Sequence, residues 1–321
     1  MVNYLPSNLN AALLIVLHVP TYATSVLPQI LNRAGKLPAS HPQDNEEIVT
    51  GHIYIAPPDY HLLVKTGFIN LVRGPKENNH RPAIDPLFHS AALAYGRRVI
   101  GVVLTGMLDD GTAGLLEIKM HGGMAVVQNP EEAMYKGMPR SAVENIEDID
   151  YIVSLSEIPD VLAKLTNTPV EAKADNPVSN PIKRNEADLL DIDGETLNNN
   201  NRVFKPSTLA CPDCGSTLWE LEQGNLLRFR CNIGHAFSLE SLRAKQSDVL
   251  ENSLWCTLRA LEDKASLSKR MAKKMRDRNQ IITAERFEKQ AQHTLAHANF
   301  IRETLIEINA NTADKSFDDS E

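Results

Sequence analysis

The chain has 321 residues, a formal net charge of −8 and a hydrophobic content of 42%. This length allows one large domain with a sizeable core plus an appendage, and the acidic charge argues against nucleic acid as a partner. Because the sequence has no apolar run long enough to span a bilayer and no charged-then-apolar leader, it predicts a cytoplasmic protein without membrane insertion.

A short apolar run near the start of the chain predicts a strand. Residues 11–17 read AALLIVL, which is too short for a membrane span and typical of a strand buried on both faces. His18 follows this run, at the carboxyl end of the strand, where open parallel α/β sheets place ligands and catalytic groups. The alternative is a histidine satisfied by a backbone carbonyl.

Two further segments indicate how the strands are connected. Residues 51–74 predict short antiparallel strands joined by turns at PPD and KTG. Residues 97–130 hold two apolar runs separated by the helical pattern TAGLLEIKMHGG, which predicts a βαβ unit with parallel strands. We therefore expect a mostly parallel, doubly wound α/β sheet within residues 1–165.

An aspartate pair follows the first strand of that βαβ unit. Asp109 and Asp110 stand between the strand and the next helix, so one of them can cap the helix. The other is then left at the carboxyl edge of a strand, the same kind of position as that of His18. A carboxylate beside an imidazole orients the general base that activates a serine. No serine in the chain stands on the strand-to-helix turn that such a nucleophile requires.

Several motifs in this part of the chain carry a family resemblance. Residues 5–165 resemble the catalytic domain of the CheB family of chemotaxis protein-glutamate methylesterases, through the motifs VLHVP, HIYIAPPDYHLLV, RGPKENNHRPAIDPLFHSAA, VVLTGMLDDGTAGL, VVQNPEEAMYKGMPRSA and DYIVSLSEI. The resemblance implies hydrolysis of glutamyl methyl esters on chemoreceptors or receptor-like signalling proteins by Ser, His and Asp. By the same resemblance, His18 is the general base, Asp110 orients it, and Met107 is the methionine beside the nucleophile.

The resemblance also identifies what the chain is expected to lack. The family's first strand and its G-A-S-x-G-G loop, which carries the serine, precede the segment that aligns with residue 5, and a receiver domain for phosphorelay control usually precedes both. We therefore expect a stand-alone, N-terminally truncated methylesterase domain without its nucleophile. The alternative is a catalytically inactive CheB-like binding or regulatory protein of a signalling pathway.

The composition changes after residue 165. Residues 166–204 contain TNTPVEAKADNPVSNP and LNNNNR, which offer too few large apolar side chains to offset the entropy of ordering. These residues are predicted to be a disordered linker.

A cysteine-bearing module is predicted over residues 205–236. Cys211, Cys214, Cys231 and His235 have the spacing C-x2-C-x16-C-x3-H around a predicted hairpin, as expected for a tetrahedral zinc site with a structural role. A cluster of buried free cysteines is the alternative. Nucleic-acid binding is the usual alternative for such a ribbon, but its three basic side chains are balanced by three acidic ones.

The remaining sequence is helical in pattern. Residues 238–309 show two stripes of apolar residues at helical spacing, separated by RDRNQ, and so predict an antiparallel helical hairpin. Residues 310–321 are predicted to be an acidic, solvated tail.

Overall fold

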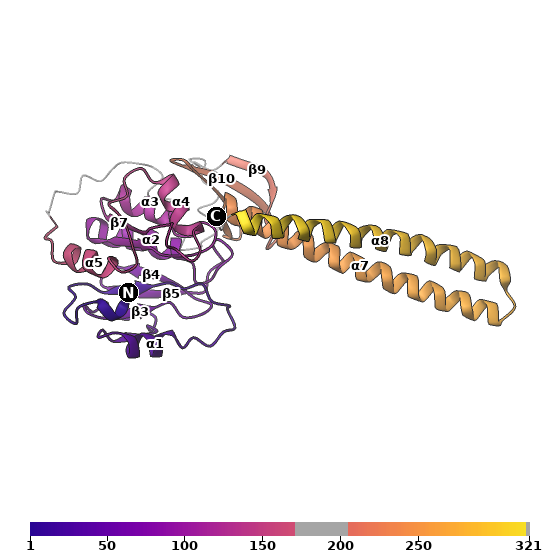
Figure 1. Cartoon of the computed structure of the whole chain (residues 1–321), viewed down its shortest axis with the longest axis horizontal. Helices are drawn as coiled ribbons and strands as arrows, with labels where there is room; N and C mark the ends of the chain where they lie inside the picture. Colours follow the sequence, from indigo (N-terminus) through magenta and orange to yellow (C-terminus); the bar gives the residue numbers. More distant parts are fainter. Residues whose placement is uncertain (171–204, 319–321) are drawn as a thin grey trace. The chain divides into compact units, whose positions relative to one another are not determined.

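The computed structural model describes residues 1–170 and 205–318 (Figure 1). The chain divides into two compact units, Met1–Leu242 and Arg243–Glu321. The helices of the first 170 residues are η1 (Val2–Tyr4), α1 (Leu27–Ala34), α2 (Ile84–Tyr95), η2 (Gly96–Arg98), α3 (Thr112–Met120), α4 (Gly137–Asn145) and α5 (Ile158–Thr166).

Parallel strands dominate this part of the first unit. One sheet has the order β1-β3-β2, from strands β1 (Leu13–Ile15), β3 (Ile53–Ile55) and β2 (Ala39–Ser40). The second has the order β6-β7-β8, from β6 (Ile100–Val103), β7 (Met124–Gln128) and β8 (Tyr151–Val153). Both sheets are parallel throughout, and α3 connects β6 to β7. The predicted parallel α/β fold and its βαβ unit are confirmed.

Two details of the predicted sheet are wrong. The parallel strands form two three-stranded sheets within the described residues, because apolar runs identify strands without fixing which of them are neighbours. The predicted antiparallel pairing across PPD is also wrong, since β3 pairs in parallel with β1 and β2. All three residues of β3 are buried, as expected for a strand in a parallel sheet. β1 itself is only half-buried.

The second half of that segment forms the hairpin that its sequence predicts. Strands β4 (His61–Lys65) and β5 (Phe68–Val72) pair antiparallel around the turn at Thr66 and Gly67. Gly67 has a φ of 87°, a left-handed conformation that glycine adopts without strain.

The core of this part contains two clusters of buried side chains. One cluster packs α2 and α3 against β7, with Phe88 and Leu115 among its members. Gly114 allows these helices to approach closely, because a Cβ atom there would lie 2.5 Å from Cβ of Phe88. The other cluster includes Ile55 of the first sheet and Val126 of the second, so the two parallel sheets share a core.

The cysteine-bearing module is a four-stranded antiparallel sheet that belongs to the first unit. Its strand order is β12-β11-β10-β9, from β12 (Ala236–Ser238), β11 (Leu226–Cys231), β10 (Thr217–Gln223) and β9 (Lys205–Ala210). Leu218, Phe229 and Phe237 form its small core together with Leu242. We call residues 205–238 the ribbon. Of the predicted linker, residues 171–204 lie outside the described residues.

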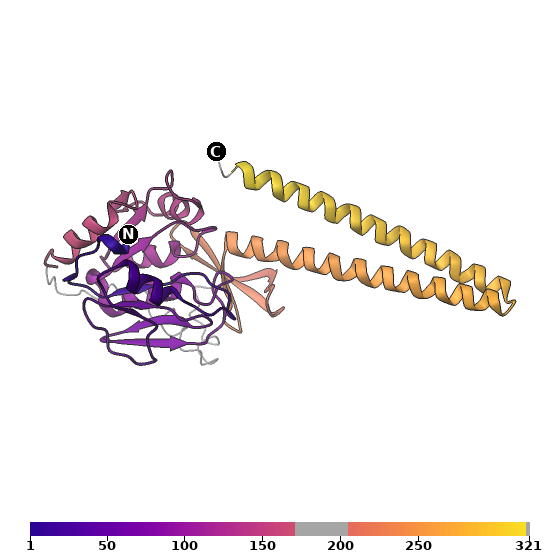
Figure 2. The same ribbon diagram turned by 60° about the horizontal axis from the view of Figure 1, so that its bottom comes forward.

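The second unit is built from two long helices. α7 (Leu239–Asp277) and α8 (Ile281–Asp318) run side by side and are joined by a tight turn that includes Asn279 (Figures 1 and 2). Leu258, Ala298 and Leu305 pack between them. α8 continues to Asp318, through most of the segment predicted to be an acidic tail. No helix in the described parts of the chain combines the length and apolar character needed to cross a bilayer.

Candidate active site and metal centre

His18 and Asp110 lie in direct contact although they are ninety-two positions apart in the sequence. The distance from His18 Nε2 to Asp110 Oδ2 is 2.6 Å, with side-chain exposures of 22% and 2%. His18 follows β1 and Asp110 follows β6, so the ends of two parallel strands bring them together. Since an ionised carboxylate only accepts hydrogen bonds, Nε2 is the donor, and in the neutral imidazole Nδ1 then keeps its lone pair.

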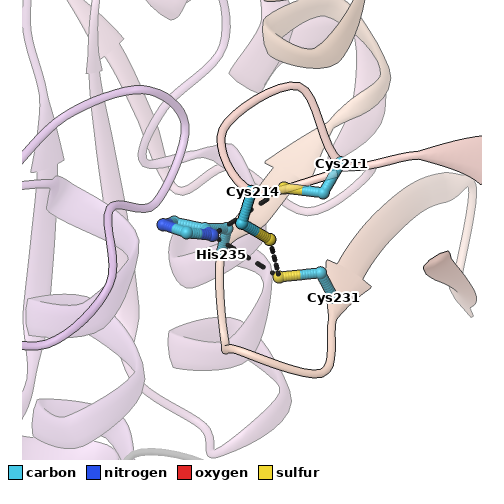
Figure 3. A group of neighbouring side chains, drawn as sticks. All are labelled: Cys211, Cys214, Cys231 and His235. Carbon is cyan, nitrogen blue, oxygen red and sulfur yellow. Dashed lines mark hydrogen bonds between the residues drawn. The ribbon is translucent and has the colours of Figure 1, made fainter. Parts of the chain in front are cut away.

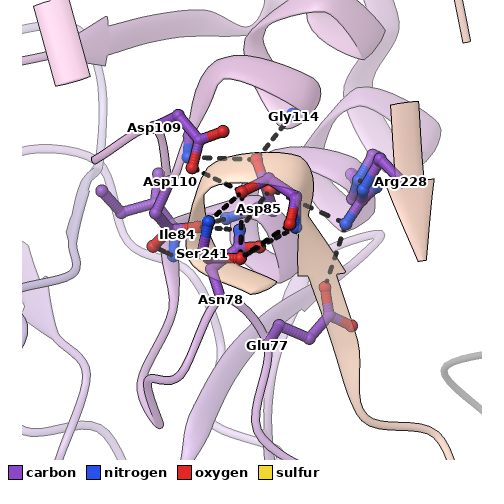
Figure 4. Close-up of polar contacts among 12 residues, drawn as sticks. Glu77, Asn78, Ile84, Asp85, Asp109, Asp110, Gly114, Arg228 and Ser241 are labelled. Atoms are coloured by element: carbon purple, nitrogen blue, oxygen red, sulfur yellow. Dashed lines mark hydrogen bonds and ion pairs between the residues drawn. The ribbon is translucent and has the colours of Figure 1, made fainter. Parts of the chain in front are cut away.

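Four donors hold the buried carboxylate of Asp110 (Figure 4). Besides His18, it accepts hydrogen bonds from the backbone nitrogen of Ile84 at 2.7 Å, that of Asp85 at 3.3 Å, and Asn78 Nδ2 at 2.9 Å. Burial alone would raise the pKa of Asp110, but the hydrogen bonds from His18, Ile84 and Asn78 lower this pKa to about 2. Asp110 is therefore ionised at neutral pH.

Neither aspartate of the predicted pair caps the helix that follows it. Gly111 occupies the N-cap of α3 with a φ of 94° and no side-chain cap. The carboxylate of Asp85, in the first turn of α2, instead accepts hydrogen bonds from Gly111 N at 3.1 Å and Gly114 N at 2.7 Å. The interpretation of Asp109 or Asp110 as the cap of α3 is wrong, because a carboxylate distant in sequence fills that role.

Asp109 contacts the ribbon rather than His18. Its Oδ1 accepts a hydrogen bond of 2.6 Å from the hydroxyl of Ser238. Burial raises the pKa of Asp109 to about 7; the negative charges of Asp85, Glu240 and Asp110 add to this rise, and the bond from Ser238 opposes it. The two neighbouring aspartates thus differ strongly in their affinity for a proton.

A second imidazole lies flat against His18. The ring of His80 is stacked on that of His18, with centroids 3.8 Å apart and planes within 3° of parallel. Burial and the neighbouring His18 lower the pKa of His80 to about 4. His80 is therefore neutral at neutral pH, so the stacked rings do not bring two positive charges face to face.

The remaining candidates of the esterase site do not contact this pair. Met107, expected beside the nucleophile, is 68% exposed on the loop between β6 and Asp110. Ser90 does not contact His18: its hydroxyl donates a hydrogen bond to the backbone of α2 and accepts one from the backbone nitrogen of Val64. Among the residues that the structure describes, no serine lies within hydrogen-bond distance of His18.

Sequence reasoning missed several members of this site. Asn78 and His80 lie on the loop between β5 and α2, in the stretch KENNHRPAID. Six polar side chains in a row before a helix are an available signal, but solvated loops have the same composition. Ser238 gives no signal of this role, because its contact with Asp109 spans 129 positions.

The four predicted metal ligands converge on one point (Figure 3). The potential ligand atoms of Cys211, Cys214, Cys231 and His235 all lie within 4.8 Å of one another. Cys214 Sγ and Cys231 Sγ are 3.7 Å apart, and His235 Nδ1 lies 3.5 Å from Cys231 Sγ and 3.7 Å from Cys211 Sγ. A tetrahedron with metal–sulfur bonds of 2.3 Å has edges of about 3.8 Å. The donor set therefore fits a metal ion.

A parallel α/β domain with a hydrogen-bonded His–Asp pair beyond its strand ends has the geometry of a hydrolase that uses a Ser-His-Asp triad. Comparison with known families identifies this domain more closely. A family model described as CheB methylesterase matches residues 1–162, and the chain belongs to this family.

Individual relatives bear related names. The chain is 42% identical over 164 residues to a protein-glutamate methylesterase/protein-glutamine glutaminase of Chromohalobacter salexigens, and 36% identical over 163 residues to that of Pyrococcus abyssi. These matches cover 50% of this chain but only 46% and 44% of the relatives, so the chain spans less than half of their length. A putative enzyme of the same name from Leptospira interrogans is 37% identical over 170 residues, which is 53% of this chain and 88% of the relative.

Solved structures were also matched. The crystal structure of the Thermotoga maritima CheB methylesterase catalytic domain is 36% identical, with a TM-score of 0.49, and the match covers 51% of this chain and 89% of that one.

Proposed function

We propose that this protein is a protein-glutamate methylesterase that hydrolyses glutamyl methyl esters on methylated chemoreceptors. The observation that carries the proposal is the 2.6 Å hydrogen bond between His18 and Asp110, within a domain of the CheB methylesterase family. The names of the relatives support the substrate class.

The proposed roles follow from the protonation of the pair. Ionised Asp110 holds the Nε2–H group of His18, which leaves Nδ1 as the base for the hydroxyl of a nucleophilic serine. The proposal requires this serine in addition to the residues that the structure describes, since none of them places a serine within hydrogen-bond distance of His18. The serine oxygen would bond to the carbonyl carbon of the ester as the bond from that carbon to methoxide breaks, and Nδ1 gives its proton to the methoxide, so that methanol leaves. The same nitrogen would then take a proton from the water that cleaves the resulting serine ester, which frees the glutamyl carboxylate and the serine hydroxyl. Met107, exposed on the loop before Asp110, is proposed to contact the substrate.

The experiment measures methanol released from a methylated chemoreceptor by the protein expressed from its complete gene. We expect release that His18→Ala lowers by about six orders of magnitude, since triad members act as a unit. His52→Ala is the matched control, because His52 bonds to Ser40 in the β2–β3 region and does not contact Asp110. Binding of the methylated receptor without release of methanol would contradict the proposal and favour a non-catalytic regulatory protein.

We further propose that the ribbon holds one Zn²⁺ ion with a structural role. Three cysteines and one histidine match the preference of zinc for sulfur and imidazole ligands, and four protein ligands leave no open position for water. The small core of the ribbon supports this role, since modules of this size need an additional source of stability. None of the four cysteines forms a disulfide, which supports a reducing, cytoplasmic location.

A further inference from the structure

One loop lies between the ribbon and the His18–Asp110 pair and contacts both. We call residues 75–81, between β5 and α2, the bridging loop. Its backbone extends the edge of the ribbon: Asn78 N donates to Ala236 O at 2.9 Å, and Ala236 N donates to Lys76 O at 3.3 Å. Glu77 and Ala236 thereby form a parallel β-bridge.

Buried charges hold the ribbon on this loop. Arg230 Nη2 lies 2.8 Å from Glu77 Oε1, and Arg228 Nη2 lies 3.4 Å from Glu77 Oε2. Arg228 also donates to His89 Nε2 at 2.9 Å and lies 3.7 Å from Asp85. Burial opposes ionisation of Glu77, but the two arginines lower its pKa. Since an unpaired charge at this depth is strongly unfavourable, these contacts favour a single docked arrangement.

The side-chain amide of Asn78 connects the ribbon to Asp110 (Figure 4). Its oxygen accepts hydrogen bonds from Ser238 N at 2.9 Å and Ser241 Oγ at 3.3 Å. Its nitrogen donates to Asp110 Oδ1 at 2.9 Å and to Asp85 Oδ2 at 2.8 Å. A flipped amide would place its oxygen against two carboxylates and its nitrogen against the backbone N–H of Ser238. The ribbon therefore fixes the orientation in which Asn78 donates to Asp110.

The same loop also contacts the imidazole of the pair. His80, two residues after Asn78, stacks on the ring of His18. One side of the bridging loop thus supports both members of the pair, while the other side is bound to the ribbon.

We propose that the ribbon is a positioning module for the His18–Asp110 pair and that Asn78 is the positioning residue through which it acts. The catalytic meaning of this inference rests on the proposed function. Ser238, which donates to Asn78, lies three residues after His235 at the end of β12. Metal binding that stabilises the ribbon therefore also stabilises the orientation of Asp110.

The first test compares Asn78→Ala with Asn79→Ala in the full chain labelled with ¹⁵N-histidine. The two positions are matched, since both have positive φ values, 48° and 71°, and both side chains contact Ser241 on α7. Asn79 donates to Ser241 O and not to Asp110. We expect His18 to be the Nε2–H tautomer in the wild type and in Asn79→Ala. In Asn78→Ala we expect a mixture of tautomers and exchange of the Nε2 proton on the order of tenfold faster.

Equal ¹⁵N signatures of His18 in the two variants would overturn the assignment of Asn78. This measurement needs no substrate, so it distinguishes failure of the positioning proposal from failure of the proposed esterase activity.

The second test removes the metal with a chelator and follows the same resonances. We expect His18 to lose its single tautomer while His52, which bonds to Ser40, keeps its signal. A metal-free protein whose His18 remains entirely in the Nε2–H form would overturn the role of the ribbon. Simultaneous loss of the His18 and His52 signals would overturn it too, because the metal would then support the whole domain rather than the pair.

Discussion

Asp85 and Asp110 each cap the helix next to the other residue. Asp85, in the first turn of α2, caps α3, and Asp110, just before α3, caps α2. Asp110, just before α3, binds the amides of Ile84 and Asp85 at the start of α2, and Asp85 binds Gly111 N and Gly114 N at the start of α3. The positive ends of both helices stabilise the two carboxylates. The orientation of Asp110 toward His18 is thus part of the packing of α2 on α3.

We predict that Gly114→Ala destabilises the protein by roughly 2–3 kcal/mol. The new Cβ atom would lie 2.5 Å from Cβ of Phe88 and 3.1 Å from Oδ1 of Asp85, which forces α2 and α3 apart. Chemical denaturation measures the loss. Gly74→Ala is the control, because its Cβ would lie 3.7 Å from the nearest side-chain atom, an ordinary contact. Similar stability of the two variants would contradict this account of helix packing.

Asp109 predicts a specific dependence of stability on pH. Its pKa in the folded protein is about 7, against an ordinary value of 3.8 for an aspartate, so the folded state retains a proton that the unfolded state has lost. The stabilisation from this proton is complete below pH 4 and is lost as the pH rises through 7. We therefore expect Asp109→Asn to be more stable than the wild type at pH 8, by roughly 1–3 kcal/mol, and to approach it at pH 5.

Thermal denaturation of both proteins across this pH range measures the difference. A stability difference that is constant between pH 5 and pH 8 would show that Asp109 does not titrate in this range.

We predict one zinc ion per chain and its loss in Cys214→Ala. Since the remaining three ligands leave the tetrahedral shell open, the variant should release its zinc to a colorimetric chelator at a concentration that leaves the wild type loaded. Cys256→Ala is the matched control, because Cys256 is a free, exposed cysteine on α7 outside the cluster. Equal zinc content in the two variants would refute the assigned ligand set.

The sequence predicts this fold best where the pattern is local. The βαβ unit can be predicted because apolar residues recur with different periods in its helix and its strands. The metal ligands can be predicted because two short spacings bracket a hairpin. Local sequence patterns predict neither the strand that pairs with β3 nor the residue that caps α3. In both cases the partner lies far along the chain, at β1 and at Asp85, and tertiary packing decides the pairing.

The candidate active site likewise has residues that the sequence predicts and residues that it does not. An aspartate beside His18 could be predicted because His18 and the pair Asp109–Asp110 each follow an apolar run, and parallel sheets collect such positions at one edge. The choice of Asp110 over Asp109 depended on the family resemblance. The contribution of the ribbon could not be predicted, since Asn78 stands in a polar loop, and Ser238 has the local pattern of a helix N-cap, a role that it also fills. Their roles depend on the docking of one module on another, which buried ion pairs to Glu77 establish.

The rate of methanol release by Asp110→Asn, set beside that of Asp109→Asn, tests the central claim most directly. Asparagine at 110 cannot hold the Nε2–H tautomer of His18 as an ionised carboxylate does, so we predict a loss of about four orders of magnitude in kcat. Asp109 contacts Ser238 and not His18, so its variant should retain most of the activity. Equal losses in the two variants, or full activity of Asp110→Asn, would contradict the assignment of His18 and Asp110 as the catalytic pair.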